Sequence, residues 1–240
     1  MERSGEVQVG AVTRVAVGRA GEHRWPAALA ILAAIVLYVL LPNRLVVGPR
    51  YVVPVLELVL LGTLIAANPH RFTRETRELR LLSLAVVLLI GLTNTVALGL
   101  LVQALLQGST AQGAQLLIAA LQVWMTNLIA FGLGYWELDR GGPVQRGIAD
   151  RERLPAADFR FPQDEDHDTV REVAARSSKW ADWRPTLVDY MYVSVTNSTA
   201  YSPTDSMPLT PRAKALMGVQ GVESFLLTIL VIARAVNLLH

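Results

Sequence analysis

The stretch LLSLAVVLLIGLTNTVALGLLVQALL, residues 81–106, decides the fold class of this chain. It contains no charged residue, and about 20 apolar residues in an α-helix are enough to cross the hydrocarbon core of a bilayer. A second stretch of this kind covers residues 114–136. Over the 240 residues, 52% are hydrophobic and the mean hydropathy is +0.37. We therefore predict an all-α, polytopic membrane protein.

Apolar stretches predict five transmembrane helices, at residues 26–41, 51–67, 81–106, 114–136 and 213–239. The first two are short, and Trp25, Tyr38 and Tyr51 near their ends suit the membrane–water interface. The predicted organisation has four parts. They are an N-terminal tail (1–25), a four-helix membrane region (26–136), a soluble connecting loop (137–185), and a C-terminal part with a short helix, a loop and the last transmembrane helix (186–240).

The arginines predict the orientation of these helices. The tail and the 68–80 connection each contain four arginines, whereas the 42–50 connection contains two and residues 108–113 contain no charge. Connections rich in arginine stay in the cytoplasm. We expect a multi-pass protein of the inner (plasma) membrane with a cytoplasmic N-terminus. Five helices then place the 137–185 connection in the cytoplasm and the C-terminus outside.

The composition also argues against several functions. The chain has no cysteine, and its net charge of +2 gives no electrostatic basis for a nucleic-acid partner. Its four histidines are scattered and form no catalytic set, so we expect neither an enzyme nor a cofactor. The acidic run DEDHD at 164–168 could bind a hard cation through oxygens. It lacks regular ligand spacing, so a solvated acidic loop is the preferred interpretation and no metal site is predicted.

Polar residues inside the predicted membrane helices are the first candidates for function, because charge at membrane depth is costly. They are Glu57, Asn127, Gln220, Glu223 and Arg234. Gln220, Glu223, Ser224 and Thr228 recur at helical spacing and predict a polar stripe on the last helix. Such a stripe either borders a wet, ion-lined path or forms hydrogen bonds between helices. The second interpretation is favoured for asparagine and glutamine, and both stay open for Glu223.

The segment between the loop and the last helix predicts an unusual path. Pro185 suits the first turn of a helix, and residues 186–198 predict a helix too short to span but of re-entrant length. Pro203 and Pro208 forbid a helix in the stretch that follows. Pro211 then starts the last helix, with Thr210 as its N-cap.

Within this segment, residues 187–236 resemble the pore loop and inner helix of bacterial two-helix potassium channels. The matching residues are Asp189, Tyr190, Tyr192, Thr199, Asp205, Pro208, Pro211, Ala233 and Arg234. The resemblance implies a filter-like loop made of Thr199, Ser202, Pro203, Thr204 and Asp205. Ser202 and Thr204 replace the two filter glycines and Pro203 replaces the filter tyrosine, so potassium selectivity is not implied. With YWELDRGGP (135–143) and SPTDSMPLTPRAK (202–214), the chain also resembles a group of uncharacterised bacterial integral membrane proteins.

Two functions follow from this resemblance. The first is an ion-channel-like protein, a weakly selective cation pore whose partners are the lipid bilayer, inorganic cations and three further copies in a homotetramer. The second is a non-conducting membrane scaffold or sensor that retains the pore-module fold. In the second case Asp205 and the neighbouring hydroxyls would cap helix ends and complete turns.

Overall fold

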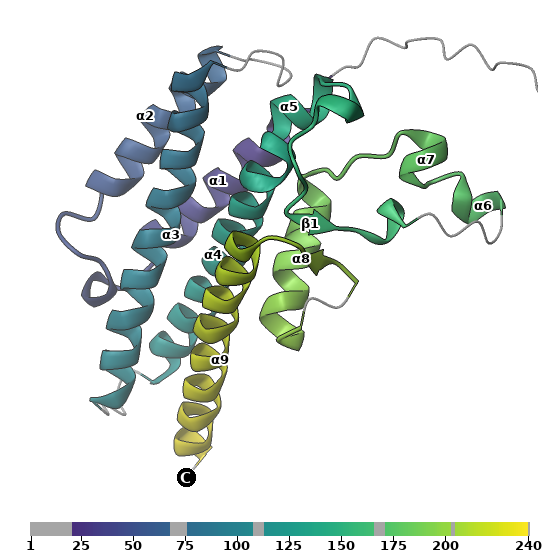
Figure 1. The fold of residues 1–240 in the computed structure, drawn as a ribbon. Helices are drawn as coiled ribbons and strands as arrows, with labels where there is room; N and C mark the ends of the chain where they lie inside the picture. Colours follow the sequence, from purple (N-terminus) through teal and green to yellow (C-terminus); the bar gives the residue numbers. More distant parts are fainter. Residues whose placement is uncertain (1–20, 68–75, 108–112, 166–170, 203–204, 240) are drawn as a thin grey trace, which may run out of the picture.

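The computed structural model describes residues 21–67, 76–107, 113–165, 171–202 and 205–239. Helices occur at all five predicted positions, namely α1 (Trp25–Val39), α2 (Val52–Ala67), α3 (Arg77–Leu106), α4 (Gly113–Leu138) and α9 (Pro211–Leu239). They lie side by side as a bundle (Figure 1). In the described part, three segments are long and apolar enough to cross a membrane: Arg77–Leu106, Ala114–Gly141 and Pro211–Arg234. The chain is therefore an α-helical membrane protein by length and composition of its helices.

The first two helices form a short hairpin. With 15 and 16 residues they are about 23 Å long, less than the roughly 30 Å of a bilayer core. The connection between them includes η1 (Asn43–Leu45). The Arg50 guanidinium donates to the carbonyls of Val39 and Leu41, at 3.0 and 2.7 Å, and so satisfies free carbonyls at the end of α1.

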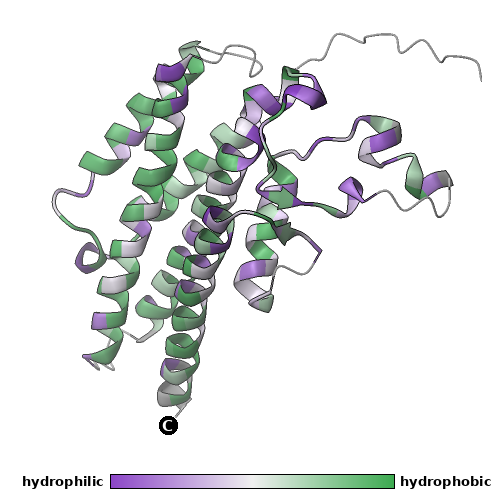
Figure 2. Cartoon of the chain, in the orientation of Figure 1, coloured by the Kyte–Doolittle hydropathy of each residue, from purple (hydrophilic) through white to green (hydrophobic). Residues whose placement is uncertain are grey.

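The outer surface of the bundle is apolar. Figure 2 shows hydrophobic residues along the outside of the long helices, whereas hydrophilic residues gather on the segment after α4. Large side chains such as Leu88, Leu121 and Ile232 are more than half exposed. A water-soluble protein rarely exposes so much contiguous apolar surface, which is what a surrounding bilayer would cover.

The segment after α4 folds against one end of the bundle. It contains η3 (Asp139–Gly141), α5 (Pro143–Ile148), η4 (Arg151–Arg153), β1 (Phe159–Arg160), η5 (Pro162–Asp164), α6 (Arg171–Ala174) and α7 (Ser178–Ala181). Gly141 and Gly142 have φ angles of +82° and +93°, which turn the chain sharply away from α4. Phe159 and Phe161 are buried and join the hydrophobic core. Much of the predicted soluble loop is thus packed onto the membrane helices.

The helix α8 (Leu187–Ala200) lies beside α4 and leads into an extended return (Figure 1). Thr186 is its N-cap, and the Asp189 carboxylate accepts from the Thr186 backbone N–H at 2.7 Å, so Pro185 precedes the helix instead of lying in its first turn. The helix has 14 residues, about 21 Å. It ends where Tyr201 takes a left-handed conformation with φ of 52°.

The return segment brings the chain back to the end where α8 began. β2 (Met207–Pro208) pairs antiparallel with β1. Thr210 caps α9 as predicted, because its Oγ1 accepts from the Ala213 backbone N–H at 3.3 Å. The helix α8 therefore starts at the loop end of the bundle and lies beside α4, and β2 lies back at the loop end, against β1.

Candidate functional site

The filter-like loop does not form an extended row of carbonyl groups at its described positions. Thr199 lies in the last turn of α8, and its hydroxyl donates to the Val195 carbonyl at 2.8 Å. It is therefore helical, not part of the irregular stretch predicted from the sequence. Ser202 and Asp205 are exposed, and Asp205 accepts from the Tyr192 hydroxyl at 3.2 Å. Pro203 and Thr204 lie outside the described residues.

Three of the four residues of the polar stripe on α9 are buried, whereas the fourth, Thr228, is exposed and accepts from the Tyr201 hydroxyl at 2.9 Å. Gln220 and Ser224 are fully buried and Glu223 is 6% exposed. From Val219 onward the large side chains that α9 exposes are apolar: Val219, Val222, Phe225, Leu226, Ile229 and Ile232. The polar side of this helix therefore faces α3, α4 and α8 within one chain.

Gln220 is the centre of the first polar cluster. Its Oε1 accepts from the Tyr135 hydroxyl of α4 at 2.6 Å and from Asn197 Nδ2 of α8 at 2.9 Å. Its Nε2 donates to Ser194 Oγ at 2.6 Å, and this hydroxyl donates to the Leu128 carbonyl at 2.8 Å. One side chain of α9 is thus bonded to both α4 and α8.

A second cluster lies about one helical turn further along α9. The hydroxyls of Ser198 and Ser224 are 2.7 Å apart, and Trp124 Nε1 donates to Ser198 at 2.8 Å. Hydrogen bonds between side chains are a common way to hold membrane helices together, because no water competes for them. This part of the stripe therefore fits the helix-packing interpretation.

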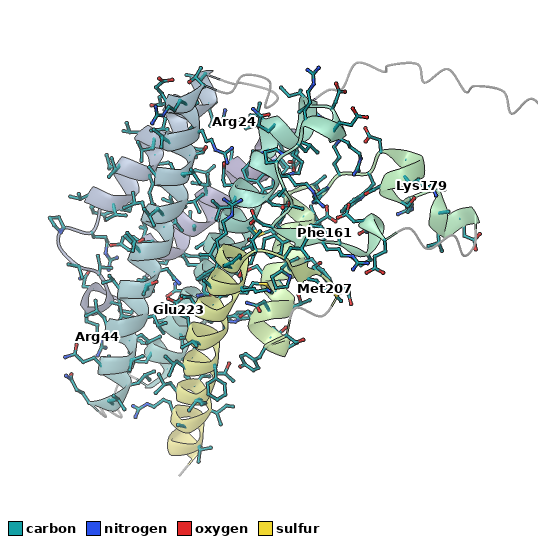
Figure 3. All side chains as sticks on the ribbon, viewed as in Figure 1. Arg24, Arg44, Phe161, Lys179, Met207 and Glu223 are labelled. Carbon is teal, nitrogen blue, oxygen red and sulfur yellow. The ribbon has the colours of Figure 1, made fainter. Side chains whose placement is uncertain are left out.

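Glu223 lies near the middle of α9, between three helices (Figure 3). Its Oε1 is 2.8 Å from Thr95 Oγ1 of α3, and its Oε2 accepts from Asn127 Nδ2 of α4 at 2.6 Å. Of these two partners, Asn127 is among the polar residues noted in the predicted helices. The sequence could not indicate that they meet, because they are 128 and 96 positions away.

The other two intramembrane charged residues are also buried. Glu57 of α2 is 2% exposed and lies within electrostatic range of Tyr38 on α1. Arg234 of α9 is 7% exposed. The helices α2 and α9 are not among the closely packed pairs, so Glu57 is not brought to Glu223, and Arg234 is eleven residues from Glu223 along α9.

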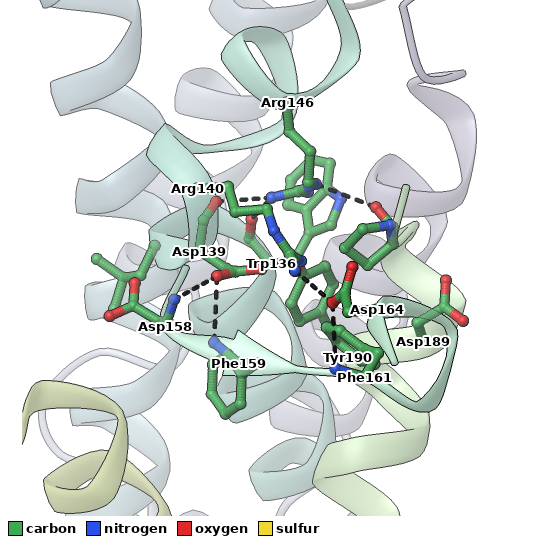
Figure 4. A network of polar contacts seen from close by, with 12 residues as sticks. Trp136, Asp139, Arg140, Arg146, Asp158, Phe159, Phe161, Asp164, Asp189 and Tyr190 are labelled. Carbon is green, nitrogen blue, oxygen red and sulfur yellow. Dashed lines mark hydrogen bonds and ion pairs between the residues drawn. The ribbon is translucent and has the colours of Figure 1, made fainter. Parts of the chain in front are cut away.

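A further polar network, not predicted from the sequence, lies at the loop end of α4 (Figure 4). Its centre is Asp139, whose carboxylate is fully buried. It accepts from the backbone N–H groups of Asp158 and Phe159, at 2.6 and 3.3 Å, and from Arg140 at 3.0 Å. The Tyr190 hydroxyl of α8 is its fourth donor. Burial raises the pKa of this hydroxyl well above its usual range, so it stays protonated and remains a donor.

Arg146 is the main cation of this network and is 1% exposed. Its guanidinium donates to the carbonyls of Pro185, Trp136 and Asp139, at 3.0, 3.0 and 2.8 Å. It also lies over the Tyr190 ring at 4.9 Å, a cation–π contact. The arginine therefore joins the end of α4 to the chain that enters α8.

Glu22 extends the network to the N-terminal segment, and Asp158 extends it to the start of α9. Glu22 accepts from Trp136 Nε1 at 2.9 Å and from the Leu187 backbone N–H at 2.8 Å, which places a carboxylate at the start of α8. Asp158 is 1% exposed and forms an ion pair with Arg212 of α9. The N-terminal segment, α4, α8 and α9 are thereby fixed to one another.

Asp164, in the described part of the acidic run at 164–168, contacts other side chains of the chain. Asp164 accepts from Arg140 and, at 2.8 Å, from the Ser178 hydroxyl, so it belongs to the same network. In the described residues, no three histidine or acidic side chains are grouped to hold a metal ion. Both oxygens of Asp164 therefore have donors from the chain itself.

Comparison with the models of known protein families, with curated proteins and with solved structures finds no match to this chain.

Proposed function

We propose that this protein is a non-conducting membrane scaffold or sensor that retains the chain order of a pore module. The observation that carries the proposal is the burial of the polar side of α9 against its own chain. The inner helix of a pore directs polar groups towards a water-filled path. Here Gln220 instead bonds to α4 and α8, Ser224 bonds to α8, and the large exposed side chains from Val219 to Ile232 are apolar.

The proposal includes five membrane-crossing helices with the loop end in the cytoplasm. The helices α1, α2, α3, α4 and α9 alternate in direction. Arg24 donates to the Leu64 carbonyl and Arg80 to the Gly141 carbonyl, so the start of α1 meets the end of α2, and the start of α3 meets the end of α4. Arg24 and Arg80, the described ends of the arginine-rich tail and of the 68–80 connection, lie at this end, which is the side that arginine favours. The short helices α1 and α2 require the bilayer to thin locally around them.

In this function, the network around Asp139 is the joint between membrane and cytoplasm. The loop after α4 is rigidly attached to α4, α8 and α9 through Arg146, Asp158 and Tyr190. A change in helix packing is therefore passed directly to the cytoplasmic surface. That is the arrangement a scaffold or a sensor needs, and it requires no passage for ions.

A cation-flux assay tests the proposal. The purified full-length chain is reconstituted in sealed liposomes, and flux of Na⁺ and K⁺ is followed over a range of voltage and pH. We expect flux equal to that of protein-free liposomes, and a monomer in native mass spectrometry. A reproducible flux that Glu223→Gln or Asp205→Asn abolishes would contradict the proposal.

The second candidate is a weakly selective cation pore formed by several copies, as in the homotetramer that the resemblance implies. One observation favours it: Thr199, Ser202 and Asp205 are all exposed, on or just after the same helix. Rings of hydroxyl and carboxylate groups attract cations. A fourfold assembly in which single cysteines at position 202 cross-link between copies would support this candidate and argue against the first.

A further inference from the structure

The surroundings of Glu223 bear on whether its carboxyl group is protonated. This carboxyl group is buried at the junction of α3, α4 and α9. In the part of the chain that the structure describes, it contacts two neutral side chains, Thr95 and Asn127, and forms no ion pair. A buried carboxylate without a cation is strongly unfavourable, and a carboxyl group in this situation takes up a proton instead.

The Thr95 hydroxyl makes two short contacts but has one hydrogen. Its Oγ1 is 3.0 Å from the Gly91 carbonyl oxygen and 2.8 Å from Glu223 Oε1. A threonine hydroxyl has one hydrogen, and a carbonyl oxygen can only accept. If Thr95 donates to Gly91, the hydrogen in its contact with Glu223 has to come from the carboxyl group. A chain then runs from Glu223 Oε1–H to Thr95 Oγ1–H to the Gly91 carbonyl.

The second carboxyl oxygen fits the same state. Glu223 Oε2 accepts from Asn127 Nδ2 at 2.6 Å. A neutral carboxyl group offers one donor and one carbonyl-like acceptor, and both are used. We propose that Glu223 is a proton-binding site inside the helix bundle, held as the neutral acid by Thr95 and Asn127. Release of the proton to water leaves a carboxylate, and Thr95 must then rotate its hydroxyl from Gly91 to Glu223 to remain hydrogen-bonded.

Among the residues that the structure describes, no charged side chain contacts Glu223. The titratable or charged residues described on the packed helices are Arg77, Glu78 and Arg80 of α3, Tyr135 and Glu137 of α4, Asp189, Tyr190 and Tyr192 of α8, and Arg212, Lys214 and Arg234 of α9. The flanking cations of α9, Lys214 and Arg234, are nine and eleven positions from Glu223, or about 14 and 16 Å along the helix. The site contains one carboxylate, so a single positive charge balances it. A proton supplies that charge without the additional oxygen ligands that a metal cation would need.

Proton binding by Glu223 goes beyond the scaffold or sensor function and does not depend on it. The carboxyl group can bind a proton whether or not the protein conducts ions. For a sensor it names the stimulus: proton release changes the contact between α3 and α9. With the added proton, both short contacts of Thr95 Oγ1 contain a hydrogen, whereas without it the single hydrogen of Thr95 can serve only one of them.

Infrared difference spectroscopy on the full-length protein in liposomes tests the inference. At neutral pH we expect a carbonyl band of a protonated carboxyl group that disappears in Glu223→Gln and persists in Glu57→Gln. Thr95→Val removes the acceptor and should shift this band to higher frequency. Thr93→Val is the matched control: Thr93 also bonds to its own helix, at 2.8 Å to the Leu89 carbonyl, and does not contact Glu223, so the band should stay in place.

Two results would overturn the inference. The first is a spectrum at neutral pH in which Glu223→Gln removes only an ionised carboxylate band. The second is a protonated band that appears solely when Na⁺ is replaced by choline, which would make Na⁺ the bound ion. Glutamine can donate to Thr95 and accept from Asn127, so we expect Glu223→Gln to fold. If it does not fold, the band position in Thr95→Val compared with Thr93→Val still shows whether the protonated group contacts Thr95. These spectra are independent of the flux assay.

Discussion

The Tyr135 hydroxyl of α4 donates a 2.6 Å hydrogen bond to Gln220 of α9, and both side chains are fully buried. This contact joins two of the three long membrane-type helices, and it belongs to the polar stripe that a conducting inner helix would expose. Gln220 instead bonds to α4 and α8 within its own chain, and this burial is the basis of the proposal that the protein does not conduct ions.

Tyr135→Phe removes this contact without changing the shape of the ring. We expect the free energy of unfolding to fall by about 1–2 kcal/mol, because a buried hydrogen bond is lost while Gln220 Oε1 keeps its bond to Asn197. Unfolding in mixed micelles measures it. Tyr51→Phe is the matched control, since Tyr51 is 65% exposed and its loss should change stability by less than about 0.5 kcal/mol. Equal effects of the two variants would contradict the importance of the Gln220 cluster.

Asp139→Asn tests the network at the loop end of α4. Asparagine keeps the size of the side chain but replaces one accepting oxygen by a donor, which faces the donors Tyr190 and Arg140. We expect a loss of about 3–5 kcal/mol, as when one partner of a buried ion pair is removed. Glu152→Gln neutralises an exposed carboxylate of the same segment and should have almost no effect. If Asp139→Asn were as harmless as this control, the network would not hold the loop.

Gly132→Ala tests the close approach of α8 to α4. An added Cβ would lie 2.5 Å from Met191 Sδ, so Met191 has to move, and we expect a cost of about 1–2 kcal/mol from overpacking. At Gly134, two residues further on the same helix, the nearest atom is Val87 Cγ1 at 3.7 Å. Gly134→Ala should therefore be neutral or stabilise the helix by up to about 1 kcal/mol. The reverse order in thermal unfolding would show that α8 is not seated as described.

Labelling of single cysteines tests the re-entrant path, and the chain has no cysteine to remove first. Glu152→Cys and Met207→Cys lie in segments joined by the β1–β2 pair, so an impermeant thiol reagent should label both from the same side of the membrane. Arg44→Cys, in the α1–α2 connection, should be labelled from the opposite side. Labelling of Met207→Cys on the side of Arg44→Cys would mean that the segment 187–210 crosses the membrane.

Much of the helical fold can be predicted from the sequence, because membrane helices must be apolar over their whole length. The stretch 81–106 is recognised by its apolar length. The start of α9 is recognised from its N-cap, Thr210, and from Pro211. The short helix before the return was also predicted, from a half-apolar run between Pro185 and Pro203. These signals are local, and each residue acts through its own backbone or its own side chain.

The contacts between distant segments could not be predicted. Asp139, Arg146 and Asp158 look like ordinary charges beside a membrane helix, and nothing in their spacing indicates burial. The signal in hindsight is the pair Gly141–Gly142, whose positive φ angles turn the loop back over the end of α4. Thr199 was misplaced because the hydroxyl-rich run looks irregular, whereas its hydroxyl bonds back to Val195 and the helix continues.

The most direct test of the account is the water accessibility of Ser224, the fully buried hydroxyl on the polar side of α9. Ser224→Cys changes one atom, and the full-length variant in liposomes is exposed to a small, membrane-impermeant thiol reagent from each side, with Glu152→Cys as the reactive control. We expect no modification of position 224 from either side, while position 152 reacts completely. Rapid modification of position 224 would reveal a water-filled path along α9 and contradict the account.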